Sequence, residues 1–287
     1  MIALVTDSNS QIPPSLVARY GITVVPLPVT IDGVQYLEGV DIDADEFYRR
    51  FDGGRAPAVA TAQPSPGQFA EAYDRLVAAG ADAILSVHIG ASISGTINSA
   101  RLAAASGSLA VPVRVVDTGT ASFAITLCAW AAAEALAAGA GIEDAAHAAE
   151  ATAATVGNVF VVRALDQARA GGRLAPDAAV AAVAAGPDAP AAIPVLSMDG
   201  GSMHVVGQAA DLAEVAELMA SHVRAAGHDL RVGIGVSDAA LFPMWSEVER
   251  RLGNAPEVRD VVRYRVGPSV GAHTGPGTLG VMFAPAR

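Results

Sequence analysis

Short runs of β-branched residues alternate with helical segments through the first half of the chain. Such alternation favours a parallel sheet whose strands are joined by crossover helices. The runs predict strands at 2–6, 22–31, 82–89 and 113–118. The segments between them predict helices at 13–20, 44–51, 66–79 and 95–105. The dipeptide Asp32-Gly33 predicts a hairpin turn that interrupts the parallel pattern.

The second half has a different pattern, in which consecutive strands surround glycine turns. After two alanine-rich helices at 121–138 and 142–155, strands are predicted at 158–162, 191–198, 202–206, 230–236, 258–264 and 278–285. Two further helices are predicted at 211–226 and 239–252. This order is typical of an α+β layer. Because 287 residues suffice for two domains, we predict an N-terminal α/β domain at 1–157 and a C-terminal α+β domain at 158–287.

The basic residues exclude several classes of enzyme. All 18 of them are arginines, so the chain contains no lysine. Phosphate-loop ATPases, protein-kinase-like phosphotransferases and pyridoxal-phosphate enzymes depend on a lysine at their centre. The formal net charge of −11 opposes binding to nucleic acid, so no nucleic-acid partner is expected.

Metal and membrane functions are not indicated either. The single cysteine, Cys128, excludes an intramolecular disulfide and a multi-cysteine metal site, and no pair of histidines has the spacing of metal ligands. We therefore expect no metal and no cofactor. The chain starts without a basic n-region, and no run reaches the roughly 20 apolar residues of a membrane span. A cytoplasmic location is expected.

Three polar loops, at 6–10, 86–100 and 116–122, directly follow predicted strands. Ligands of open α/β sheets bind beyond the carboxyl ends of the strands, which makes these loops a candidate anion site. The candidate residues in them are Asp7, Ser8, Ser92, Ser94 and Thr96. An ordinary structural role is the alternative, with Ser94 as a helix N-cap and Asp7 as a capping or turn residue.

Two other stretches contain candidate binding residues. The stretch TAQPSPGQF at 61–69 places Thr61 in a hydroxyl-rich segment ahead of a predicted helix. The stretch GPSVGAHTGPGTLG at 267–280 places His273 and Thr274 among five glycines. Glycines on both sides allow the backbone to approach a partner closely. A turn in which His273 binds nothing is the alternative.

Six short motifs occur in the order and spacing of one protein family. They are VTDSNS at 5–10, TAQPSP at 61–66, SISGT at 92–96, VDTG at 116–119, GGRL at 171–174 and GAHTGPG at 271–277. With these motifs the chain resembles the DegV family over nearly its whole length.

The resemblance implies a two-domain lipid-binding protein with one long-chain fatty acid, such as palmitate, stearate or oleate, in a tunnel between its domains. It implies that Thr61 and Ser94 hydrogen-bond the carboxylate and that His273 and Thr274 lie nearby. It also implies a carrier without catalytic activity of its own, acting in phospholipid metabolism as the fatty-acid-binding subunit of bacterial fatty acid kinase. Such a carrier presents the carboxylate to a separate ATP-binding kinase subunit, which forms acyl phosphate. Transient contact with a membrane is compatible with this role.

Other interpretations remain open at this stage. Arg173 in the GGRL motif is a candidate contact with the kinase subunit, or alternatively a helix-terminal arginine. The chain departs from the family pattern at Gly90-Ala91, where serines are usual, and has no arginine directly after Gly200-Gly201. The alternatives are an enzyme that acts on a small anion and a regulatory lipid-binding protein without a kinase partner.

Overall fold

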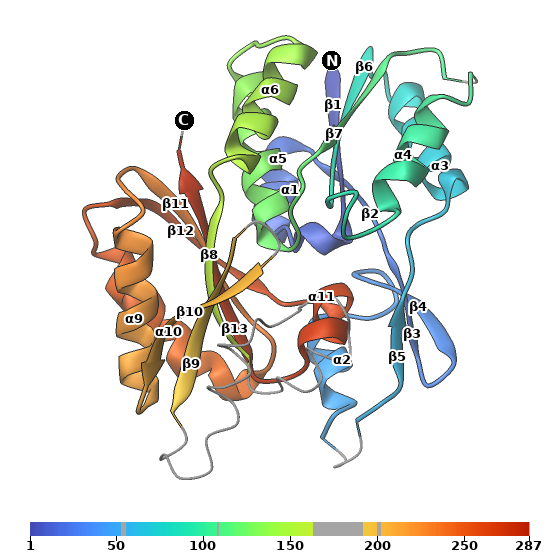
Figure 1. Ribbon diagram of the computed structural model, residues 1–287. Helices are drawn as coiled ribbons and strands as arrows, with labels where there is room; N and C mark the ends of the chain where they lie inside the picture. Colours follow the sequence, from blue (N-terminus) through green and yellow to red (C-terminus); the bar gives the residue numbers. More distant parts are fainter. Residues whose placement is uncertain (53–55, 108, 163–191, 200–201, 287) are drawn as a thin grey trace. The chain divides into compact units, whose positions relative to one another are not determined.

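The computed structural model describes residues 1–52, 56–107, 109–162, 192–199 and 202–286 (Figure 1). They form two compact units. The first comprises Met1–Asp43 and Pro57–Thr155, and the second comprises Ala44–Ala56 and Val156–Ala286. The segment Ala44–Ala56, which the sequence analysis assigned to the first domain, groups with the second unit.

The first unit contains a four-stranded parallel sheet in the order β2-β1-β6-β7. Its strands are β1 (Ile2–Asp7), β2 (Thr23–Val25), β6 (Ala83–His88) and β7 (Val113–Asp117). Its helical elements are η1 (Ser8–Ser10), α1 (Pro14–Tyr20), α3 (Pro66–Ala78), α4 (Thr96–Ala104), α5 (Phe123–Ala137) and α6 (Ile142–Ala153). Figure 1 shows α3 and α4 on one side of the sheet, and α5 and α6 on the other. The predicted parallel sheet is confirmed.

Helices on both faces explain the apolar strands of this sheet. Every residue of β6 is buried, as is usual for parallel strands covered on two sides. On the side of α3 and α4, the core includes Phe69 and Tyr73 packed with Val5 and Ile84. On α5, Cys128 is fully buried, and burial raises the pKa of its thiol to about 12, so it acts as a small apolar side chain.

A small antiparallel sheet also belongs to the first unit. Its order is β4-β3-β5, with β3 (Pro28–Ile31), β4 (Val34–Leu37) and β5 (Val59–Thr61). Asp32 and Gly33 have φ angles of 48° and 85°, as the central residues of a type I′ turn require, so the predicted hairpin is confirmed. The single strand predicted at 22–31 is wrong in one respect: it divides at Pro26, which has no N–H to donate, into β2 and β3 of different sheets.

The second unit contains a six-stranded mixed sheet in the order β10-β9-β8-β13-β11-β12. The strands are β8 (Gly157–Val162), β9 (Ile193–Asp199), β10 (Ser202–Ala209), β11 (Leu230–Val236), β12 (Val258–Arg265) and β13 (Thr278–Pro285). All neighbouring strands are antiparallel except β11 and β12. The helical elements are α2 (Ala44–Arg49), α9 (Leu212–Arg224), η2 (Ala239–Leu241), α10 (Phe242–Gly253) and α11 (Pro268–Thr274).

The core of the second unit lies between this sheet and the pair α9 and α10. Val215 and Met219 of α9 and Val248 of α10 are fully buried against strand residues such as Val232 and Ile234. Figure 1 shows the two helices side by side on one face. The predicted α+β arrangement is confirmed. Among the helices of both units that the structure describes, none has the length and apolar character to span a bilayer.

Candidate functional site

The carboxyl ends of β1, β6 and β7 lie together at one edge of the parallel sheet. From β1 the chain continues to β2 on one side, and it later returns to β6 on the other side. The strand order therefore reverses between β1 and β6. In open α/β sheets, ligands bind outside the strands at this switch point. The loops at this point contain the candidate residues Ser8, Ser92 and Ser94.

A buried chain of polar side chains lies beneath these loops. Asp7 Oδ2 is 2.9 Å from His88 Nδ1, and His88 Nε2 is 2.6 Å from Ser86 Oγ. Ser86 Oγ is in turn 2.9 Å from the Tyr73 hydroxyl. All four side chains are fully buried. Burial raises the pKa of Tyr73 to about 12, so its phenol keeps its proton and can donate a hydrogen bond.

The hydrogen-bonded side chains of Asp7, His88 and Ser86 have the same order of contacts as a serine hydrolase triad. Their surroundings, however, are those of a buried structural network. Ser86 Oγ is buried and already bonded to Tyr73, so a substrate cannot reach it. Asp7 also accepts hydrogen bonds from Asn9 N at 3.0 Å and Ile89 N at 3.1 Å. The Asp7 carboxylate thus ties the loop after β1 to the loop after β6.

The sequence analysis did not single out Ser86. The sequence did contain a signal that Ser86 and His88 could interact. The two residues are two positions apart on one strand, so their side chains lie on the same face of the sheet.

Ser8 is also engaged within the first unit. Its hydroxyl donates to Glu38 Oε2 at 2.5 Å and accepts from Leu27 N at 2.9 Å. Glu38 is buried although it carries a carboxylate. Ser8 and Asp7 therefore hold the loop after β1 from two directions.

Ser94 and Thr96 form a pair of hydroxyls at the start of α4. Ser94 Oγ is 2.9 Å from Thr96 Oγ1 and accepts a longer bond from Thr96 N at 3.3 Å. The N-cap position belongs to Gly95, which has no side chain to cap the helix, so Ser94 is not the N-cap itself. Ser94 is half-buried, whereas Ser92 is exposed. The free N–H groups and dipole of a helix N-terminus favour an anion at such a place.

The segment that follows Thr61 comes near this helix start through Gln63. A Cβ atom at Gly95 would lie only 2.0 Å from Gln63 Oε1, so the missing side chain of Gly95 lets the Gln63 amide lie against the backbone. Thr61 is the last residue of β5 and is half-buried. The structure therefore brings the segments of Thr61 and Ser94 together within the first unit.

His273 and Thr274 lie at the end of α11 in the second unit. Their segment is a short helix, not only a turn, because Pro268 occupies a first-turn position that suits its fixed φ. Both side chains are half-buried. At Gly271 on the same helix, a Cβ would lie 2.3 Å from the Tyr48 hydroxyl oxygen. Helix α2 therefore packs directly against α11.

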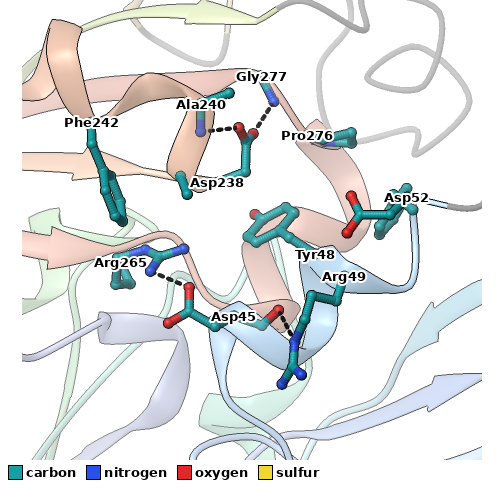
Figure 2. A pocket seen from close by; sticks show the side chains of 12 residues that line it. Asp45, Tyr48, Arg49, Asp52, Asp238, Ala240, Phe242, Arg265, Pro276 and Gly277 are labelled. Carbon is teal, nitrogen blue, oxygen red and sulfur yellow. Dashed lines mark hydrogen bonds and ion pairs between the residues drawn. The ribbon is translucent and has the colours of Figure 1, made fainter.

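A cavity of about 750 Å³ lies beside the turn that follows α11 (Figure 2). It is lined by Asp45, Tyr48, Arg49, Phe51, Asp52, Asp238, Ala239, Ala240, Phe242, Arg265, Pro276 and Gly277. Arg265 pairs with Asp45, donates to Ser237 O at 2.7 Å and lies 5.3 Å from the centre of the Phe242 ring. This cavity is within the second unit, and the sequence analysis did not anticipate it.

The structure does not describe the candidate partner-contact residue, and the residues it does describe form no metal site. Arg173 and the GGRL motif fall outside the described residues. In the part of the chain that is described, no three His, Cys, Asp or Glu side chains gather in a way that could hold a metal ion.

Comparison with known proteins gives one consistent result. A family model described as "Uncharacterised protein, DegV family" matches residues 1–286. A DegV domain-containing protein of Streptomyces coelicolor is 36% identical over 288 residues, which cover 99% of this chain and 98% of the relative.

Solved structures resemble the chain over the same extent. A DegV family protein of Thermus thermophilus, described as fatty-acid-binding, is 31% identical with a TM-score of 0.84, and the match covers 99% of both chains. DegV of Bacillus subtilis, described as a fatty acid binding protein, is 25% identical with a TM-score of 0.82, again over 99% of both. The chain belongs to the DegV family.

Proposed function

We propose that this chain binds a long-chain fatty acid and that Thr61 and Ser94 hydrogen-bond its carboxylate. The observation that carries the proposal is the approach of the Thr61 segment to the start of α4, where Gln63 lies against Gly95. Fatty-acid binding by the Thermus and Bacillus relatives supports the choice of ligand. The further head-group residues in this proposal are His273 and Thr274, with Ser92 and Thr96 as secondary ones.

The two ends of the fatty acid contribute different amounts to the free energy of binding. About fifteen buried methylenes at roughly 0.8 kcal/mol each provide about 12 kcal/mol before the costs of association. A hydrogen bond to a charged group contributes about 1.5–3 kcal/mol. The apolar tail therefore provides most of the affinity, and the hydroxyls determine where the carboxylate lies.

We further propose that the chain is a carrier that presents this carboxylate to a separate ATP-binding kinase subunit. A carboxylate oxygen would attack the γ-phosphorus of ATP, ADP would leave, and acyl phosphate would form. The chain has no lysine of the kind that contacts the phosphates of ATP in kinases and phosphate-loop ATPases, which supports a separate ATP-binding subunit. In this proposal Arg173 contacts the kinase subunit.

Native mass spectrometry and a coupled assay test these two steps separately. We expect the gently purified protein to carry one fatty acid, and the delipidated protein to take up one oleate per chain. With ATP, oleate and a purified fatty acid kinase subunit, we expect ADP release that requires this chain. A chain that neither retains nor takes up oleate or palmitate contradicts the binding proposal. Oleate binding without chain-dependent ADP release contradicts only the kinase step.

Replacement of Ser94 with alanine is expected to weaken oleate binding about 10- to 100-fold without abolishing it, because one charge-assisted hydrogen bond is lost while the tail contacts remain. Isothermal calorimetry measures the affinity, and the NMR signal of carboxyl-labelled oleate reports the head group. Ser106→Ala, just beyond the other end of α4, is the control, since Ser106 donates to Ala103 O at 2.8 Å and is far along the helix from Ser94. Unchanged affinity and an unchanged carboxyl signal in Ser94→Ala would remove Ser94 from the site.

A further inference from the structure

We infer that Asp238 is a positioning residue for the end of α11, which carries His273 and Thr274. Its carboxylate fixes the turn after this helix. Loss of the carboxylate should therefore displace His273, and, as a consequence that rests on the proposed function, it should weaken fatty-acid binding.

The contacts of Asp238 extend beyond those of a helix cap. Asp238 Oδ1 accepts from Ala240 N at 3.2 Å, which caps η2 in the ordinary way. Asp238 Oδ2 accepts from Ser237 Oγ and from Gly277 N, both at 2.7 Å. Figure 2 shows the carboxylate between Ala240 and Gly277. One side chain thus joins the end of β11, the start of η2 and the turn after α11.

The turn after α11 is Gly275-Pro276-Gly277, in which Pro276 fixes its own φ but the two glycines restrict the backbone little, so contacts from outside the turn help to hold it. Gly275 and Gly277 have φ angles of 72° and 77°, and glycine adopts such values as readily as many others. Thr278 N donates to Ser237 Oγ at 2.9 Å, and Thr278 Oγ1 donates to Gly275 O at 3.1 Å. Ser237 and Asp238 therefore hold two successive N–H groups of the turn, and Thr278 closes the carbonyl end of the helix.

Arg265 supports the same arrangement from the other side of the cavity. It donates to Ser237 O at 2.7 Å and pairs with Asp45 on α2. Since α2 also packs against Gly271, α11 is fixed both along its length and at the turn beyond its end. Both charged side chains are therefore engaged within the protein, Arg265 with Ser237 O and Asp45, and Asp238 with Ala240 N and Gly277 N. This favours a positioning role for this cavity wall over a site for a separate charged ligand.

Asp238→Ala tests the inference in ligand-free protein, with Asp211→Ala as the matched control. Asp211 caps α9 in the same unit by accepting a hydrogen bond from Glu214 N at 2.9 Å. In the sequence, Asp211 is far from the turn that follows α11. In Asp238→Ala we expect about tenfold faster hydrogen exchange at Gly277 N and a shifted His273 ring signal in NMR spectra. Asp211→Ala should change neither, and Asp238→Asn, which keeps one acceptor oxygen, should give an intermediate result.

Oleate binding provides the second measurement. We expect Asp238→Ala to weaken it about tenfold and Asp211→Ala to leave it unchanged. Unchanged Gly277 exchange and an unchanged His273 signal in Asp238→Ala would overturn the positioning role, as would equal changes in Asp211→Ala. If these signals change as expected but the wild-type protein binds no oleate, the positioning role stands and the proposed function fails.

Discussion

Replacement of Asp7 with alanine is expected to lower the free energy of unfolding of the first unit by about 3–5 kcal/mol, because several buried donors lose their acceptor and each unsatisfied buried donor costs about 1–3 kcal/mol. The carboxylate is the acceptor for His88 Nδ1 at 2.9 Å, Asn9 N at 3.0 Å and Ile89 N at 3.1 Å. Each of these buried donors would lose its bond to the carboxylate. Since a typical domain is stable by about 5–15 kcal/mol, the variant should be close to unfolding.

The two tryptophans allow this effect to be measured in one unit at a time. Trp130 lies on α5 in the first unit, and Trp245 lies on α10 in the second. In a Trp245→Phe background, urea unfolding followed by fluorescence therefore reports on the first unit.

Asp41→Ala is the control for Asp7→Ala. Asp41 is exposed and accepts one bond, from Leu37 N at 2.8 Å, so its loss should cost about 1 kcal/mol or less. If Asp7 and His88 act as a pair, Asp7→Ala and His88→Ala together should cost less than the sum of the two single changes. A loss in Asp7→Ala no larger than in Asp41→Ala would show that the buried network contributes little.

The elements of the first unit could be predicted because their determinants are local. Ser65 and Gln68 form a capping box before α3, with Pro66 in the first turn, and each of these signals is visible in the sequence. Asp32-Gly33 likewise determines its own hairpin. In the second unit, Pro268 is a local signal of the same kind at the start of α11, but the sequence analysis predicted no helix in this glycine-rich stretch around His273.

The contacts that organise the candidate site could not be predicted in this way. Asp238 has the sequence pattern of an ordinary cap, but its bond to Gly277 N spans 39 residues. The contact between Gln63 and Gly95 likewise depends on how two loops fold over the sheet. Ser94 was predicted from a loop at a strand end, Thr61 from a hydroxyl-rich segment ahead of a helix, and both from family resemblance. Only the tertiary structure brings their segments together.

Replacement of Gly271 with alanine is the corresponding prediction for the second unit. A Cβ atom there would lie 2.3 Å from the Tyr48 hydroxyl oxygen and 2.8 Å from Phe47 Cε1. The two rings cannot easily move away, because both are buried and pack edge to face with centroids 5.0 Å apart. The added methyl group must therefore separate α2 from α11. We expect a loss of about 1–3 kcal/mol in stability, the usual cost of overpacking, and weaker oleate binding through displacement of His273.

Fluorescence of Trp245 in a Trp130→Phe background measures the stability of the second unit in this variant. Gly253→Ala at the end of α10 is the control, since no atom lies within 4 Å of the added Cβ and alanine suits a helix better than glycine. It should be neutral or stabilising. Combining Gly271→Ala with Tyr48→Phe should restore part of the loss, because the nearest clashing atom is then absent. If Gly271→Ala instead matches Gly253→Ala in stability, α2 does not pack tightly enough on α11 to hold His273 in place.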